Sequence, residues 1–167
     1  NKRNFNILNQ YVDIKLSSSD FLSTQYEQVH IKYKSLDLNL WSPTITVPKE
    51  FQLAPTSNLR ILHSFVSQNR GHGDKNIKGS PFIVEAIERL QQEGHKVEYF
   101  YLKDVESKYM RYYQVQADIV IDQLICGWWG STSLEAMALG KPTICYLREG
   151  AKRQFFRHFP EYSKLPI

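Results

Sequence analysis

The stretch from Ala117 to Pro142 most constrains how this chain folds. It opens with a nearly continuous apolar run from Ile119 to Ile125, the pattern of a strand buried on both faces of a sheet. Gly127 and Gly130 then interrupt the run, and a short helical segment follows that ends at Gly140. Three hydroxyl residues are candidate N-caps for that helix: Ser131, Thr132 and Ser133. This order predicts a helix whose N-terminus lies at the carboxyl end of a parallel strand, where open α/β sheets bind ligands.

Strand-like and helix-like segments alternate on both sides of this stretch. Apolar runs predict strands at 59–66, 97–102 and 143–147, and apolar spacing predicts helices at 80–93, 105–116 and 150–158. Ser80 followed by Pro81 is a standard helix start, with the serine as the cap. The alternation predicts an α/β fold, with a Rossmann-like parallel sheet and helices on both faces.

The N-terminal residues form a smaller predicted unit. Residues 1–34 have the pattern of a strand, a short helix and a second strand, which is too small to hold a core by itself. Three prolines follow, so we place a linker or domain boundary at 43–58.

Composition excludes several classes of protein. Hydrophobic residues make up 42% of the 167 residues and charged residues 23%, which allows a packed core and argues against disorder. The net charge of +4 suits phosphorylated ligands, and no basic run is dense enough to indicate nucleic-acid binding. Cys126 and Cys145 are too few for a disulfide framework, and we expect both to be small core residues. No apolar run approaches the roughly 20 residues that a membrane helix needs.

The loop after the strand at 59–66 contains two cations, Arg70 and Lys78, among three glycines. A strand-to-helix loop of this kind opens at the same sheet edge as the 127–133 loop. Two cations and a helix N-terminus facing one cleft suit a diphosphate, whose negative charge grows as it leaves a sugar. The alternative is a solvated loop with ordinary surface charges.

Several side chains beside the glycine loop leave two interpretations open. Glu135 either binds the ribose hydroxyls of a nucleotide or is simply favoured near the positive end of its helix. Asp122 either contacts a ligand or caps the following loop, and we slightly favour the loop. Of Trp128 and Trp129, we expect one to pack in the core and one to stack on a base or sugar. The histidines lack metal-ligand spacing, so we expect no metal site.

The C-terminal segment is basic and aromatic. Its phenylalanines share one helical face, which favours packing onto the domain, with attachment to a membrane surface as the alternative. The residues concerned are Phe155, Phe156 and Phe159, beside Lys152, Arg153 and Arg157.

Three motifs resemble those of a known family. They are N-R-G-H-G-D-K-N-I-K-G-S at 69–80, A-D-I-V-I-D-Q-L at 117–124 and G-W-W-G-S-T-S-L-E-A-M-A-L-G-K-P at 127–142. With them, the segment 59–147 resembles the C-terminal, nucleotide-sugar-binding domain of retaining bacterial GT-B glycosyltransferases. The stretch 12–43, ending in L-D-L-N-L-W-S-P, is similar to the end of the family's N-terminal domain. The resemblance implies that 1–45 is a remnant of that domain with its linker, and that 46–167 binds the nucleotide sugar.

The resemblance also implies a function and a set of site residues. The chain would be the donor half of an enzyme of polysaccharide or glycoconjugate synthesis, moving a sugar from a nucleotide-diphosphate sugar to an acceptor hydroxyl. Arg70 and Lys78 match the family's basic pair on the diphosphate, and Glu135 matches the glutamate that holds the ribose. The loop and turn that approach the phosphates correspond to Gly127, Gly130, Ser131, Thr132 and Ser133. No cofactor or metal is implied, because the basic pair and the helix N-terminus take the metal's electrostatic role.

One departure from the family pattern stands out. Family members often carry a second glutamate eight positions before the first, in contact with the transferred sugar, and here that position is Gly127. Asp122 is a candidate substitute. A binding module without turnover and a nucleotide-sugar epimerase of the same fold are the alternative functions. The chain starts at Asn1 without Met, so we expect a piece of a longer enzyme, inactive without its N-terminal half, in the cytoplasm or on the inner membrane face.

Overall fold

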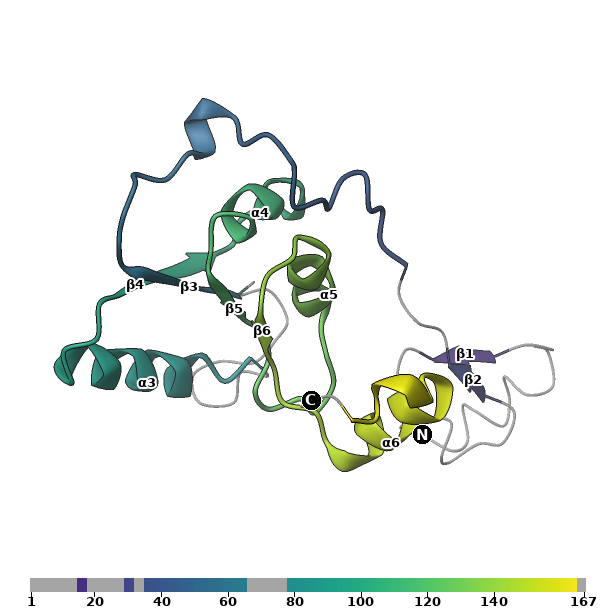
Figure 1. The fold of residues 1–167 in the computed structure, drawn as a ribbon. Helices are drawn as coiled ribbons and strands as arrows, with labels where there is room; N and C mark the ends of the chain where they lie inside the picture. The colour runs from purple at the N-terminus through teal and green to yellow at the C-terminus, as the bar shows by residue number, and fades with distance from the viewer. Residues whose placement is uncertain (1–14, 18–28, 32–34, 66–77, 165–167) are drawn as a thin grey trace. The chain divides into compact units, whose positions relative to one another are not determined.

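The computed structural model describes residues 15–17, 29–31, 35–65 and 78–164 (Figure 1). The chain divides into two compact units, one comprising Leu36–Arg148 and the other residues 1–35 together with 149–167. The boundary that we expected after residue 45 therefore falls inside the larger unit, and residues 149–167 group with the N-terminal residues.

The larger unit is an α/β domain with a four-stranded, entirely parallel sheet in the order β4-β3-β5-β6. Its elements are η1 (Lys49–Phe51), β3 (Leu59–Phe65), α3 (Ser80–Gln92), β4 (Val97–Lys103), α4 (Ser107–Gln114), β5 (Ile119–Ile121), α5 (Ser131–Ala138) and β6 (Thr143–Ile144). The predicted Rossmann-like fold is thereby confirmed.

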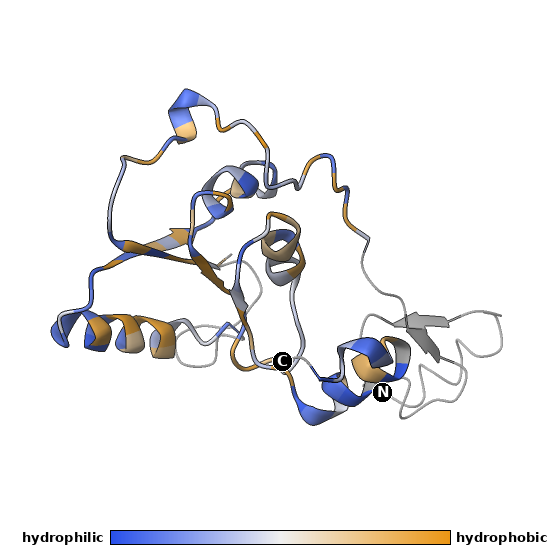
Figure 2. Ribbon diagram, in the orientation of Figure 1, coloured by the Kyte–Doolittle hydropathy of each residue, from blue (hydrophilic) through white to orange (hydrophobic). Residues whose placement is uncertain are grey.

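Helices cover both faces of this sheet (Figure 1). On one face, Ile83 and Ile87 of α3 pack against Ile61 and Ile121 of the central strands. On the other face, Ala136 of α5 joins a cluster that also contains residues of β3, β5 and α4. Strands β3 and β5 are mainly hydrophobic in Figure 2 because both of their faces are covered.

Gly140, the glycine predicted to end α5, ends it with a left-handed backbone and two hydrogen bonds to the last turn. Gly140 has a φ of 73°, in the left-handed region that glycine adopts without steric cost. Its N–H donates to Met137 O at 3.0 Å, and the Lys141 N–H donates to Ala136 O at 2.9 Å. These two bonds form a Schellman motif, which satisfies the last carbonyls of the helix.

The strand predicted to run through Ile125 ends at Ile121, because the chain leaves the sheet at Asp122. Beyond that point Ile125 is 45% exposed and Cys126 is also exposed, so the expectation of a core role for Cys126 was wrong. The predicted helix caps were wrong as well: Gly79 is the N-cap of α3, and Gly130 is the N-cap of α5.

The proline-containing segment before β3 packs against the sheet domain. Trp41 is buried in a cluster with Met110 of α4 and Leu139. The Phe51 ring stacks on Tyr109 of α4, with centroids 5.0 Å apart. The predicted linker is therefore held on α4 by apolar contacts.

The smaller unit contains a pair of parallel strands, β1 (Lys15–Ser17) and β2 (Val29–Ile31). The helix predicted between them lies outside the described residues. The unit also contains α6 (Glu149–His158) and the 3₁₀ helix η3 (Pro160–Tyr162). The rings of Phe155 and Phe159 lie 5.1 Å apart, so the aromatic residues of this segment pack on one another.

Among the described residues, none of the helices combines the length and apolar character needed to cross a membrane.

Candidate functional site

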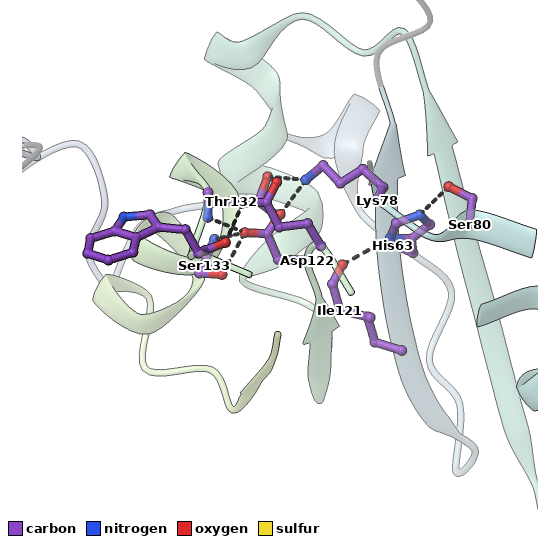
Figure 3. Close-up of polar contacts among 10 residues, drawn as sticks. His63, Lys78, Ser80, Ile121, Asp122, Thr132 and Ser133 are labelled. Carbon is purple, nitrogen blue, oxygen red and sulfur yellow. Dashed lines mark hydrogen bonds and ion pairs between the residues drawn. The ribbon is translucent and has the colours of Figure 1, made fainter. Parts of the chain in front are cut away.

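The strand order places a topological switch point between β3 and β5. From β3 the chain crosses to β4 on one side, and from β4 it returns to β5 on the other side. At such a point the connections diverge and leave a crevice at the carboxyl ends of the strands, where α/β proteins bind ligands. Here those ends are occupied by a buried polar network, drawn in Figure 3.

Asp122 is the centre of this network. It follows β5 directly, and its side chain is completely buried. Its Oδ2 accepts hydrogen bonds from the Gly130 N–H at 2.8 Å, the Ser133 N–H at 3.3 Å and the Ser133 hydroxyl at 2.6 Å. The carboxylate therefore supplies the N-terminal capping of α5 that we had assigned to a hydroxyl residue.

Lys78 binds the other oxygen of the same carboxylate. Its ammonium group forms a buried ion pair with Asp122 Oδ1 and donates a hydrogen bond to Thr132 Oγ1 at 3.2 Å (Figure 3). The Lys78 backbone is held as well, because its carbonyl accepts from the Leu124 N–H at 3.1 Å. The cation expected to face a cleft is thus engaged inside the protein, next to the N-terminus of α5.

The electrostatic balance keeps Asp122 ionised. Burial by itself would raise the pKa of this carboxyl, since it disfavours the charged form. The Lys78 charge and the hydrogen bonds from Lys78, Ser133 and Gly130 outweigh burial, so the pKa of Asp122 lies below its ordinary value of 3.8. The helix N-terminus thus holds a permanent negative charge supplied by the protein itself.

Close approach of this carboxylate explains the glycine at position 130. A Cβ atom built on Gly130 would lie 2.7 Å from Asp122 Oδ2, well inside van der Waals contact. The backbone of Gly130 is extended, with φ of −91° and ψ of 180°, so its conformation by itself does not require glycine. The capping carboxylate is what excludes any side chain here.

His63 forms a second buried pair at the end of β3. Its Nδ1 lies 3.0 Å from Ile121 O, and its Nε2 lies 2.8 Å from Ser80 Oγ (Figure 3). A carbonyl oxygen only accepts, so Nδ1 carries the proton and the neutral ring accepts the Ser80 hydroxyl hydrogen at Nε2. Burial is the main cause that lowers the pKa of His63 from 6.5, and the nearby Lys78 charge adds to it.

This pair predicts a loss of stability in mild acid. The unfolded chain binds a proton at His63 near pH 6.5, whereas the folded protein resists protonation because its pKa is lower. The free energy of unfolding should therefore be highest above pH 6.5 and fall as the pH drops toward the folded-state pKa. Urea titrations at pH 7.5, 6.5 and 5.5 measure the slope. His63→Gln should flatten it while the exposed-site control His95→Gln keeps it, and an unchanged slope in His63→Gln would contradict the assignment.

The other predicted site residues have different environments. Arg70 lies outside the described residues. Ser133 is fully buried and both its N–H and its hydroxyl are committed to Asp122. Ser131 is exposed, and Thr132 and Glu135 are half-buried. Ser131 and Glu135 are four residues apart in α5 and so share one face of the helix.

Gly127 is buried, and its backbone has a φ of 76°. A Cβ atom at this position would lie 3.2 to 3.3 Å from three side-chain carbons of Arg148. The Arg148 N–H also donates to Gly127 O at 3.0 Å. An acidic side chain at this position would require strained backbone and displacement of Arg148, which gives a structural reason for the glycine.

The two tryptophans have different environments. Trp128 is 9% exposed and joins the core, and its carbonyl accepts a hydrogen bond from the Gln123 side chain. Trp129 is half-buried, with its ring centroid 4.6 Å from that of Trp128. Trp129 therefore offers the more accessible of the two rings, beside the start of α5.

Sequence reasoning missed the contribution of His63 and Ser80. His63 was grouped with the histidines that lack metal-ligand spacing, and Ser80 was predicted to be a helix cap. A histidine at the carboxyl end of an otherwise apolar strand is the signal that could have identified the pair, because a buried imidazole needs hydrogen-bond partners.

A scan against protein-family models finds no match to this chain, and a search of curated proteins finds no significant one.

Proposed function

We propose that the chain is the donor-binding half of a glycosyltransferase and binds a nucleotide-diphosphate sugar at the N-terminus of α5. One observation carries the proposal. The glycine-loop and helix motif of 127–142, which resembles that of GT-B transferases, lies at the switch point of a parallel sheet. A ligand there meets backbone N–H groups and the positive end of a helix dipole.

Two of the backbone N–H groups at the start of α5 already donate to the protein's own carboxylate, Asp122. The proposal places the phosphate oxygens beside Ser131 and Thr132 in the first turn of α5, next to the Gly130 and Ser133 N–H groups that donate to Asp122. Glu135 lies on the same helical face as Ser131, one turn further along α5, and the proposal assigns it to the ribose of a nucleotide whose diphosphate binds at the helix start. Lys78 lies beside Thr132, and the proposal retains Arg70 as the second cation.

The reaction proposed for the complete enzyme is a displacement at the anomeric carbon. The bond from that carbon to the diphosphate oxygen breaks, and a bond to the acceptor oxygen forms. The acceptor hydroxyl loses its proton, and the nucleoside diphosphate leaves with the bonding electrons. Positive charge beside the diphosphate stabilises the negative charge that develops on it.

Calorimetric titration with UDP, GDP and ADP tests the proposal. We expect one of them to bind with a dissociation constant between micromolar and millimolar, and Arg70→Ala to weaken that binding. Glu135→Gln should weaken it roughly tenfold, because a neutral amide accepts weaker hydrogen bonds from the ribose hydroxyls. The matched control is Glu88→Gln on the exposed side of α3, which should bind as wild type.

A nucleotide that lacks the ribose hydroxyls tests whether Glu135 acts on those hydroxyls. The 2′,3′-dideoxy analogue of the bound nucleotide should bind wild type and Glu135→Gln equally. If Glu135→Gln binds the ordinary nucleotide as tightly as wild type, the ribose role is wrong.

Gly127 favours a second candidate function, a binding module without turnover. Gly127 has no side chain that could contact a transferred sugar, and its left-handed backbone and the nearby Arg148 oppose adding one. Assay of the full-length protein for acceptor-dependent release of nucleoside diphosphate separates the two, and clear release would exclude the module. Release that depends on an added acceptor would also count against an epimerase.

A further inference from the structure

We propose that Asp122 is a built-in competitor for the Lys78 ammonium group, which limits how tightly the start of α5 holds a diphosphate and so favours product release. This inference rests on the proposed function and adds a control of affinity to the same site. Asp122 would act through Lys78, as a positioning residue, without touching the ligand.

The N-terminus of α5 already carries one full negative charge, held by two backbone N–H groups, the Ser133 hydroxyl and Lys78. Lys78 and Asp122 together are electrically neutral. An incoming diphosphate therefore meets the helix dipole and a neutral pair, rather than an uncompensated cation.

Without the Asp122 carboxylate, the Lys78 ammonium group still has another partner nearby. Lys78 Nζ already lies 3.2 Å from the Thr132 hydroxyl, on the half-buried first turn of α5. In Asp122→Asn, the amide oxygen still accepts from the Gly130 and Ser133 N–H groups, but the amide NH₂ replaces the oxygen that faced Lys78. Two donors repel each other, so the ammonium would move toward Thr132 and the ligand.

The nucleoside diphosphate released by transfer carries one more negative charge than the donor sugar did. A site with an uncompensated cation would hold this product more tightly than the substrate, and product release often limits the rate of evolved enzymes. An internal carboxylate that shares the cation reduces this difference.

The test is calorimetric titration of the 167-residue chain with UDP, GDP and ADP in turn. For the nucleotide that binds, Asp122→Asn should bind about tenfold more tightly than wild type, as expected for one charge removed several ångströms from a diphosphate. Adding Lys78→Met to Asp122→Asn should abolish this gain. The matched control is Glu98→Gln, which removes one negative charge from the Arg60–Glu98 pair on the same sheet and should leave the affinity unchanged.

The outcomes separate this inference from the proposed function. Wild-type binding together with equal or weaker binding by a folded Asp122→Asn would overturn the inference and leave the proposed function intact. Binding by Asp122→Asn alone would support both. Absence of binding in every variant would contradict both. Circular dichroism and thermal melting establish that each variant is folded.

The double variant serves as the test if Asp122→Asn does not fold. Lys78→Met/Asp122→Asn removes both buried charges together, so it avoids an uncompensated buried ion. An affinity within about threefold of wild type would support the inference, because it would show that the Lys78–Asp122 pair adds almost no net attraction for the ligand. A loss of tenfold or more would show that the Lys78 charge acts on the ligand despite Asp122, and would overturn the inference.

Discussion

Replacing Lys78 by methionine should lower the free energy of unfolding by about 3 kcal/mol, a large part of the total stability of a domain of this size. The substitution keeps most of the apolar volume but leaves the Asp122 carboxylate buried without its cation. Three hydrogen bonds to Asp122 remain, from Gly130 and Ser133. For this reason we expect the low end of the range measured for broken buried ion pairs. Urea denaturation at pH 7, followed by tryptophan fluorescence, gives the value.

Two controls make this prediction specific to the ion pair. Lys103→Met, at an exposed position of β4, should change stability by less than about 0.5 kcal/mol. The second control is pH. The lowered pKa of Asp122 stabilises the wild type above pH 3.8, and this stabilisation is lost as the pH falls through the folded-state pKa. The difference between wild type and Lys78→Met should therefore shrink in acid, and a loss below about 1 kcal/mol at pH 7 would contradict the buried ion pair.

Gly130→Ala should destabilise the protein by about 2–3 kcal/mol through a steric clash alone. The added methyl group would lie 2.7 Å from Asp122 Oδ2 and 3.1 Å from Oδ1. Either the carboxylate moves away from its donors or the N-terminus of α5 shifts, and both disrupt the cap. Because the first turn of α5 is displaced in either case, nucleotide affinity should fall together with stability. Denaturation and calorimetry of the same variant measure the two effects.

Gly94→Ala is the matched control for this clash. Gly94 has a φ of 87°, and a Cβ there would have no atom within 4 Å. Its substitution therefore costs only the backbone strain of a left-handed alanine, about 1 kcal/mol, and should not alter ligand binding. If Gly130→Ala proved no more destabilising than Gly94→Ala, the close approach of Asp122 would be wrong.

Much of the fold could be predicted from the sequence because its signals are local. The apolar run of β3, the Pro81 start of α3 and the Gly140 end of α5 all act within a few residues. The extent of β5 could not be predicted, because the apolar run continues to Ile125 while the strand ends at Ile121. The strand ends because Asp122 turns toward α5 and contacts it. This contact joins two separate elements, so no local signal marks it.

The sequence predicted which segments meet at the candidate site, but not how their side chains are paired. Order along the chain placed the glycine loop, α5 and Lys78 at one edge of a parallel sheet. The partner of Lys78 could not be read from the chain, because Asp122 is 44 residues away and carries no local signal for an ion pair. The same holds for His63 and Ser80, which are 17 residues apart.

By itself, the sequence determined the alternation of strands and helices and the position of the glycine loop and α5 at the carboxyl edge of the sheet. Hydrophobic periodicity and turn residues specify both within short windows. Only the tertiary structure decided that the expected cation is paired inside the protein and that a carboxylate, rather than a hydroxyl, caps α5. The physical reason is that a buried charge takes whichever partner the packing brings near, and that choice is made between residues far apart in the chain.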